Sequence, residues 1–416
     1  MKRRQVLLSA GATAILQGAW TQAMAQGKEV VVGAIYPLTG PSAQVGIDAK
    51  QAFETALDII NNASTIDLPT AKNAGLAGLG GAKVRVVYAD HQADPQKGRS
   101  EAERLITQDN VCAIVGCYHS SVSTTVSATC ERYGVPFVCA DSSSPSLNRR
   151  NLKFFFRTAA HDEMFSDAMF DFMDALKAKG QKIATVGLFY EDTIFGTDSS
   201  SVQRKLANAR GYKIACDIKY RNNSPSLTAE AQQLKNANPD VLMPSSYTTD
   251  AILLTNAMAQ LGYKPTNIIA QAAGFVEKPA LDAVGDKLNG MITRASFSVD
   301  MGAKRKSAEV VNGMFKAKAG RDLNDQTSRQ FSALMVLAEA IDRAGTVDPR
   351  KIRDALAATD IPGDKTIMPW ARVKFDETGQ NTFANPVLIQ WNKGAFATVF
   401  PFEVATAKLV WPMNAS

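Results

Sequence analysis

The sequence predicts an α/β protein made of two Rossmann-like lobes, each with a parallel central sheet. Short β-branched or apolar runs alternate with stretches of helical periodicity, which is typical of parallel sheets covered by helices on both faces. The alternation extends from residue 30 to residue 140 and begins again at residue 162. Each half is long enough to bury a core of its own, so we expect two lobes.

The periodicity predicts the individual strands and helices in chain order. The first half is expected to contain strands at Val30–Ile35, Lys83–Ala89, Cys112–Val115 and Pro136–Ala140, with helices at 45–62, 95–108 and 120–132. The second half is expected to contain strands at Lys182–Phe189, Tyr212–Ile218, Val241–Met243 and Asn267–Ala270, with helices at 162–179, 196–209, 226–236 and 248–261. No Pro-, Gly- or Ser-rich linker separates the halves, so short ordered connections are expected.

The first 25 residues have the pattern of an export signal. A basic start (2–4) precedes an apolar stretch (6–16), and Ala23-Met24-Ala25 is a small-residue cleavage site. The Arg3-Arg4 pair fits either a twin-arginine signal or an ordinary secretory signal. Both routes lead out of the cytoplasm, so the mature chain is expected to begin at Gln26.

Charge and hydropathy argue against two classes of partner. Removing residues 2–4 lowers the formal charge from +6 to +3, and no long basic run is left to bind nucleic acid. No later apolar run reaches the roughly 20 residues that span a bilayer. A soluble exported protein is therefore expected, with no nucleic-acid partner and no cofactor.

Five cysteines, Cys112, Cys117, Cys130, Cys139 and Cys216, would enter an oxidising compartment. The odd number leaves at least one unpaired, and the spacing does not fix the connectivity. No C-x-x-C pair occurs and the chain has three histidines, so a metal site is not expected. A single disulfide and buried thiols are the two interpretations.

The glycine-rich stretch Ala74–Gly81 has the composition of a phosphate-binding loop. That motif follows a strand and opens a helix, whereas these glycines come just before the strand expected at Lys83. A flexible connection is therefore expected there.

Two clusters of hydroxyl side chains, His119-Ser120-Ser121 and Ser142-Ser143-Ser144, directly follow expected strands. Open α/β sheets bind ligands beyond the carboxyl ends of their strands, where a helix start points unpaired N–H groups at the ligand. Both clusters are therefore candidate ligand-binding groups, and Ser120 is the candidate for a carboxylate. Helix capping and turn formation explain Ser120 and Ser142 equally well.

Four segments resemble the branched-chain amino acid binding proteins of ABC importers, which are type I periplasmic solute-binding proteins. They are Val30–Asn61 with its PLTGP stretch, Tyr88–Ile106 with DPQK, Val115–Thr125 and Gly187–Gly196. The resemblance covers nearly the whole mature chain in order, and PLTGP and DPQK are fairly specific to this group.

The resemblance implies a periplasmic receptor without catalysis. It would hold one small polar solute, an amino acid, an amide or a small organic or aromatic acid, between two lobes joined by a three-segment hinge. It would then deliver that solute to the membrane permease of an ABC importer. Lobe one would comprise 26–160 and 298–385, and lobe two 161–297 and 386–416. We expect a monomer.

The resemblance also assigns candidate ligand-binding residues. Ser120 falls where a serine holds the ligand carboxylate, and Tyr247 where a tyrosine closes over the ligand. Val45 and Gln326 stand where the family often has aromatics that shape the side-chain pocket. The full candidate set is Val45, Tyr118, His119, Ser120, Ser142, Ser143, Ser144, Phe195, Tyr247, Ala273 and Gln326.

Ala273 departs from the family's pattern. The amino-acid binders carry a glutamate there that pairs with the ligand ammonium, whereas this chain reads QAAGF. An ammonium buried without a charged partner costs several kcal/mol. Unless Glu191 or Asp192 substitutes, the departure favours an amide or a carboxylic acid over leucine, isoleucine or valine. For both acids, a solvated turn before a helix is the other interpretation.

Two other functions are alternatives. An exported hydrolase would use a serine with His91, His119 or His161, but no G-x-S-x-G elbow occurs, and adjacency to Ser120 does not orient a base. A ligand-sensing module would use the same fold, and only neighbouring genes would separate it from an importer receptor.

Overall fold

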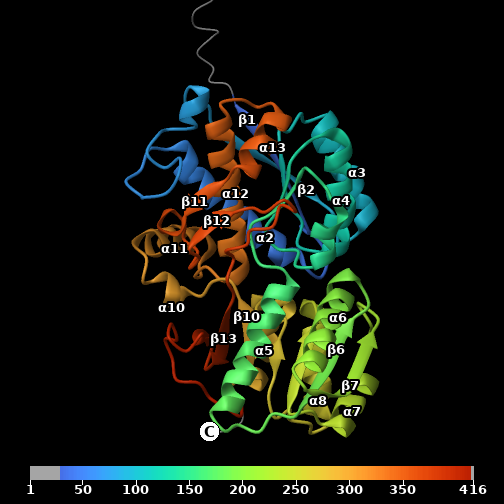
Figure 1. The fold of residues 1–416 in the computed structure, drawn as a ribbon. Coiled ribbons are helices and arrows are strands. Elements are labelled where there is room, and N and C mark those ends of the chain that lie inside the picture. Colours follow the sequence, from blue (N-terminus) through green and yellow to red (C-terminus); the bar gives the residue numbers. More distant parts are fainter. Residues whose placement is uncertain (1–28, 414–416) are drawn as a thin grey trace, which may run out of the picture.

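The computed structural model describes residues 29–413 and contains two lobes, stacked one above the other in Figure 1. The sheet of the first lobe has the order β2-β1-β3-β4-β5, and its neighbouring strands are all parallel. Its strands are β1 (Val30–Tyr36), β2 (Val84–Asp90), β3 (Ile114–Gly116), β4 (Phe137–Cys139) and β5 (Phe155–Arg157).

Helices cover both faces of this sheet. α3 (Pro95–Thr107) and α4 (Ser120–Tyr133) pack together on one side, and α2 (Ala43–Asn61) and α12 (Asp325–Ala344) lie on the other (Figure 1). Asn324 begins α12 with a capping box, in which its side chain accepts from the Thr327 amide and its own backbone N–H donates to Thr327 Oγ1. The lobe is completed by α10 (Val299–Gly302), α11 (Lys306–Ala319), α13 (Pro349–Ala357) and the antiparallel pair β11 (Asp360–Pro362) and β12 (Arg372–Lys374), with short 3-10 helices at Ala77–Leu79, Pro145–Arg150 and Gly363–Lys365.

The second lobe contains a parallel sheet of order β7-β6-β8 and a second sheet of order β9-β10-β13-β14. An isolated β-bridge between Leu242 and Ile268 connects the two sheets. Its strands are β6 (Thr185–Glu191), β7 (Lys213–Tyr220), β8 (Val241–Ser245), β9 (Ile269–Ala270), β10 (Ile292–Ala295), β13 (Val387–Asn392) and β14 (Ala395–Phe400). Its helices are α5 (Asp162–Ala178), α6 (Ile194–Ala209), α7 (Thr228–Ala237), α8 (Thr248–Gln260) and α9 (Lys278–Val284), with 3-10 turns η3 (Ala273–Phe275) and η4 (Gly285–Leu288).

The α/β fold class with two lobes is confirmed, and the expected strands and helices occur with ends shifted by three residues or fewer. The second sheet is not purely parallel, because β13 pairs antiparallel with β10 and with β14. Lys393 and Gly394 both have positive φ, as the two central residues of a tight hairpin turn do. This turn joins β13 to β14, so the two strands run antiparallel and need no crossover helix. The chain crosses between the lobes after β5, after β10 and after β12 (Figure 1). The limits given above for each lobe stay a prediction.

Two smaller expectations have an outcome. All five cysteines are free thiols and four of them are buried, which agrees with the buried-thiol interpretation. In the connection Ala74–Gly81, Gly78 N–H donates to Asp342 Oδ1 at 2.7 Å, and a Cβ at Gly78 would lie 2.0 Å from the Asp342 carbonyl oxygen; the flexibility expected there stays a prediction. Within residues 29–413 no helix is both long and apolar enough to span a bilayer. The expected export signal lies outside the described residues.

Candidate functional site

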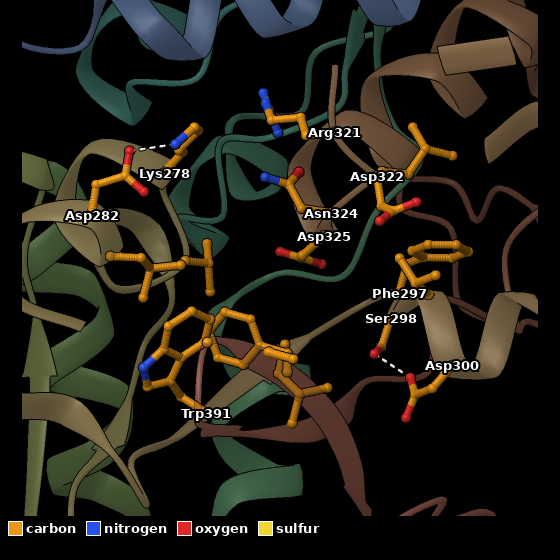
Figure 2. Close-up of a pocket in the computed structure, with 18 residues that line it drawn as sticks. Lys278, Asp282, Phe297, Ser298, Asp300, Arg321, Asp322, Asn324, Asp325 and Trp391 are labelled. Atoms are coloured by element: carbon orange, nitrogen blue, oxygen red, sulfur yellow. Dashed lines mark hydrogen bonds and ion pairs between the residues drawn. The ribbon is translucent and has the colours of Figure 1, made fainter. Parts of the chain in front are cut away.

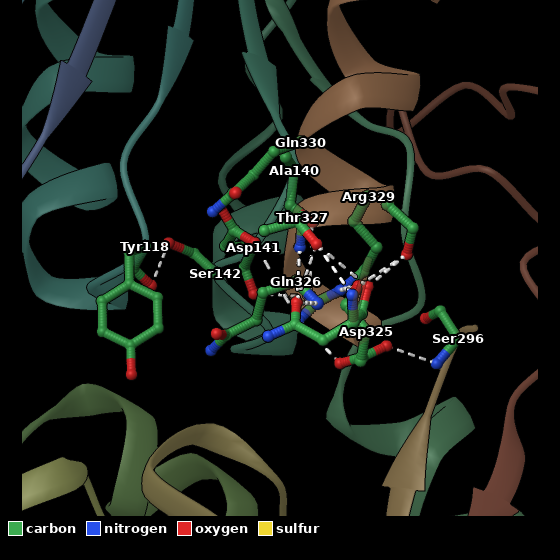
Figure 3. A network of polar contacts seen from close by, with 12 residues as sticks. Tyr118, Ala140, Asp141, Ser142, Ser296, Asp325, Gln326, Thr327, Arg329 and Gln330 are labelled. Atoms are coloured by element: carbon green, nitrogen blue, oxygen red, sulfur yellow. Dashed lines mark hydrogen bonds and ion pairs between the residues drawn. The ribbon is translucent and has the colours of Figure 1, made fainter. Parts of the chain in front are cut away.

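The two hydroxyl clusters meet at the carboxyl ends of β3 and β4. Ser120 is the first residue of α4, and the cluster Ser142–Ser144 follows β4. Ser142 Oγ donates to the Tyr118 carbonyl at 2.9 Å, as Figure 3 shows, and the Ser144 amide donates to Ser120 Oγ at 3.4 Å. The parallel order of the sheet therefore brings together two clusters that are 24 residues apart in sequence.

Lobe two places aromatic rings and a small residue opposite these hydroxyls. Tyr247 is the N-cap of α8, and its ring centroid lies 5.1 Å from that of Phe195 on α6 and 5.5 Å from that of Tyr118 in lobe one. Ala273 lies in η3. The two lobes therefore touch directly through aromatic side chains.

One buried cavity lies at this junction, with a volume of about 10 Å³. Its lining residues are Tyr118, Ser120, Asp141, Ser143, Phe195, Tyr247, Ala273, Arg294, Gln326 and Arg329. The volume is enough for about one water molecule. The structure is therefore a closed form in which the side chains fill the space between the lobes.

Seven of the eleven candidate ligand-binding residues line this cavity, and four do not. Val45 lies on the buried face of α2, in the hydrophobic core. His119 packs its ring against Tyr118 and Tyr247. Ser142 bonds to the Tyr118 carbonyl, and Ser144 caps a 3-10 helix. These four lie behind the cavity wall, and ligand contact by all eleven stays a prediction.

Glu277 is an acid of this site that the sequence analysis missed. It accepts hydrogen bonds from Tyr118 Oη and, at 3.3 Å, from Gln326 Nε2, both in lobe one, and from Thr248 Oγ1 in lobe two. Burial raises the pKa of its carboxyl from 4.5 to about 7, and the charges of Asp48 and Asp141 add to the rise. Its position four residues after Ala273 was the signal that could have found it.

The two acids considered as substitutes for the missing glutamate have other partners. Glu191 accepts from the Thr193 amide at 2.5 Å and from the Gly196 amide at 2.7 Å, so it caps the start of α6. It is fully buried, which corrects the expectation of a solvated turn. Asp192 Oδ1 accepts from the Asn222 amide at 2.9 Å. Neither acid lines the cavity.

Arg329, which lines the cavity, binds the surrounding carboxylates and carbonyls (Figure 3). Its Nη2 donates to Asp325 Oδ2 at 2.9 Å, and its Nη1 donates to the carbonyls of Ala140 and Asp141 at 3.3 Å. Asp325 Oδ1 also accepts from the Ser296 amide at 2.5 Å. This network connects β4, α12 and the segment after β10, so it fixes the base of the cavity.

The backbone around the cavity adopts conformations that are uncommon for residues with a Cβ. Tyr118 has a φ of 81°, Ala272 of 53° and Ala273 of 49°. Such conformations cost about 1 to 3 kcal/mol each and cluster at functional sites. Gly274 allows the closest approach, because a Cβ there would lie 2.5 Å from the Tyr247 backbone.

No histidine ring in residues 29–413 is hydrogen-bonded to a serine hydroxyl. His91 accepts from the Ala93 amide and contacts the Cys117 carbonyl, both at 2.9 Å. His161 Nδ1 accepts from the Met164 amide. Burial holds the pKa of His119 well below its usual range, and its Nδ1 has no partner in the described part of the chain.

A larger and more open groove of about 560 Å³ lies beside the cavity (Figure 2). Trp391 forms part of its wall in lobe two and Phe297 in the segment after β10. Asp325 lines the groove while the next residue, Gln326, lines the cavity. Its charged side chains already have partners, for example Lys278 with Asp282. The groove is thus a space next to the cavity, with no unsatisfied charge to select a ligand.

Comparison with known proteins gives consistent matches over most of the chain. A family model described as periplasmic binding protein matches residues 29–395. The Leu/Ile/Val-binding protein homolog 8 of Brucella suis biovar 1 (strain 1330) is 28% identical over 418 residues, covering 98% of this chain and 99% of the relative.

Two solved structures show the same fold. A leucine binding protein from Thermotoga maritima MSB8 superposes with a TM-score of 0.76 at 21% identity, over 90% of this chain and 99% of that one. A solute binding protein of an ABC transporter from Rhodopseudomonas palustris BisB5, in complex with 3,4-dihydroxybenzoic acid, gives a TM-score of 0.73 at 18% identity, over 88% of this chain and 95% of that one.

Proposed function

This chain belongs to the periplasmic binding protein family, and we propose that it is the extracytoplasmic receptor of an ABC importer. It captures one small polar solute, an amino acid, an amide or a small organic or aromatic acid, between its lobes. It then presents the loaded, closed form to the membrane permease. The site lies within one chain, so the receptor is proposed to act as a monomer.

The observation that carries this proposal is the convergence of side chains from both lobes on one buried cavity. Ser120, Ser143 and Gln326 come from lobe one, and Phe195 and Tyr247 come from lobe two. Hydroxyl, amide and aromatic groups of this kind bind small polar solutes in concave sites. A site divided between two lobes is complete only when the lobes are closed.

The size of the cavity determines how a solute must enter. A space for about one water molecule cannot hold an amino acid or an aromatic acid, so the lobes must separate first. Separation breaks the contacts of Glu277 with Tyr118 and Gln326, and that of Ser144 with Asp198. The lobes then close around the solute. Closure changes the relative positions of the two lobes, which allows a permease to distinguish the loaded protein from the empty one.

A thermal-shift screen of the mature protein, with amino acids, amides, urea and aromatic acids, tests this function. A solute that binds only the folded state raises the melting temperature. Small-angle X-ray scattering of the open form should then show a smaller radius of gyration when that solute is added, and no change with a compound that gave no thermal shift. A tight solute that leaves the scattering profile of an open protein unchanged would contradict the closure mechanism.

The alternatives predict different results. A hydrolase would turn over an ester or amide substrate, yet none of the described histidine rings is hydrogen-bonded to a serine hydroxyl, so no observation favours it. A sensing module would bind and close in the same way. Permease and ATPase genes beside this gene would support transport, and a regulator gene alone would support sensing.

A further inference from the structure

Arg294 is a buried cation in the wall of the cavity. It belongs to β10, next to the point where the chain leaves lobe two for lobe one, and it is 2% exposed. Its guanidinium carbon lies 3.8 Å from the ring centroid of Phe165, which supports one face of the group. Ser120 and Ser143 line the same cavity.

The guanidinium group has hydrogen-bond donors to spare. Its Nε and Nη1 have no hydrogen-bond partner in residues 29–413. Its nearest carboxylate oxygen is Asp325 Oδ2, 3.6 Å from Nη1, which is beyond the length of a hydrogen bond. Buried arginines are normally paired and bonded, so this one lacks a hydrogen-bonded anion.

The carboxylates nearby are already occupied by other donors. Asp325 accepts from the Ser296 amide and from Arg329. Asp162 accepts from Gln271 Nε2 at 2.8 Å and from Ser199 Oγ at 3.0 Å. In residues 29–413 neither aspartate accepts a hydrogen bond from Arg294 Nε or Nη1. The protein therefore contains a cation that its own anions do not satisfy.

The group stays charged in spite of its burial. Burial and the charge of Arg329 lower the pKa of Arg294 to about 10, while Asp325 and Asp162 act in the opposite direction. At neutral pH the guanidinium is thus protonated. An underpaired buried charge destabilises a protein by several kcal/mol. Buried charges of this kind are found mainly at functional sites.

Resting on the receptor function proposed above, we infer that Arg294 binds an anionic group of the solute and that the cleft selects a carboxylate without an ammonium group. A carboxylate would accept from one free donor of the guanidinium, Nε or Nη1, together with the hydroxyls of Ser120 and Ser143. An ammonium would compete with existing partners of the nearby carboxylates. Both oxygens of Glu277 accept bonds from the protein, and Asp141 accepts from Tyr36 and Gln330 through Oδ2 while its Oδ1, which has no hydrogen-bond partner, lies 3.9 Å from Arg329 Nη2. Arg294 would also repel the ammonium.

Titration calorimetry with matched solutes tests this inference. The probes are a panel of small carboxylates that includes benzoate, 3,4-dihydroxybenzoate and 4-methylvalerate, with benzamide, 4-methylvaleramide and leucine as partners of the same carbon skeleton. For the wild type we expect the best carboxylate to bind roughly tenfold or more tightly than its amide or amino acid, as a charge-assisted pair requires. Arg294→Gln should remove this preference, and Arg294→Lys should retain part of it.

Thermal unfolding of the solute-free variants separates recognition from folding. Since Arg294 is underpaired, Arg294→Gln should unfold at the same or a higher temperature than the wild type. A folded variant that keeps the carboxylate preference overturns the inference. So does a wild type that binds none of the carboxylates, or binds leucine or an amide as tightly as the matching acid. If the wild type closes on leucine or an amide, the inference about Arg294 fails but the receptor function is still supported. If the protein closes on no small solute, the receptor function itself is contradicted.

Discussion

Closure of the lobes should weaken as pH rises, because Glu277 is buried between them. In the closed form its carboxyl bonds to Tyr118 and Gln326 across the cleft, and its pKa is raised from 4.5 to about 7. In an open form water reaches this carboxyl, so its pKa falls back toward its ordinary value. The perturbation that isolates this effect is Glu277→Gln, which keeps the shape and the acceptor and removes the titration.

The sign and the size of the effect follow from the raised pKa. A carboxyl whose pKa is higher in the closed form favours closure fully below about pH 4.5, and this contribution is lost as pH rises through about 7. If the whole shift comes from closure, the equilibrium changes by roughly 3 kcal/mol across this range. Glu277→Gln should be insensitive to pH over the same interval.

Small-angle X-ray scattering of the solute-free protein between about pH 5 and pH 8 measures this equilibrium. The wild type should expand as pH rises, and Glu277→Gln should keep a constant radius of gyration. Glu191→Gln is the matched control, since Glu191 is also buried with a pKa raised to about 7 but bonds only within lobe two. A wild type of constant size, or a Glu191→Gln variant that loses the pH response, would refute the reasoning.

Three further substitutions test the cavity. Ser120→Ala should weaken solute binding by about 1 to 3 kcal/mol, because the buried acceptor of the solute loses one hydrogen-bond donor. Calorimetry should show unchanged affinity for Ser127→Ala, because Ser127 lies on the same helix but does not line the cavity. Ala273→Glu should impair binding of the native solute, because it places an unpaired charge in the closed cavity. For the same reason the wild type, which has no glutamate there, should bind leucine weakly. Leucine binding by the wild type at micromolar or tighter levels would contradict both predictions. Gly274→Ala should lower stability by about 1 to 3 kcal/mol through its clash with the Tyr247 backbone; scanning calorimetry should find no such loss for Gly313→Ala, where nothing lies within 4 Å.

Much of the fold was predictable because its signals are local. Hydrophobic periodicity and helix-start residues act over a few positions, and they placed the strands and helices in both lobes. β5, the helices from α9 onward and the strands from β10 onward were not predicted. Most of these strands are short, and β13 and β14 form a hairpin, so they do not follow the strand-helix alternation used to find the others.

The sequence by itself determined that hydroxyl groups gather at one edge of a sheet. Ser120 and Ser142–Ser144 each follow a strand, and parallel neighbouring strands end at the same edge. Their meeting therefore needed only the strand order. Tyr247 and Phe195, on the opposing wall, were assigned only through the resemblance to a known family.

Only the tertiary structure decided which charges are left unsatisfied. Arg294 and Arg329 both lie near Asp325, yet Arg329 donates to it at 2.9 Å while Arg294 stays 3.6 Å away. Glu277 likewise acquires its raised pKa from lobe-one partners far away in the sequence. The strength of a charge–charge interaction depends on distance and on burial, and neither quantity exists until segments distant in the chain have packed against one another.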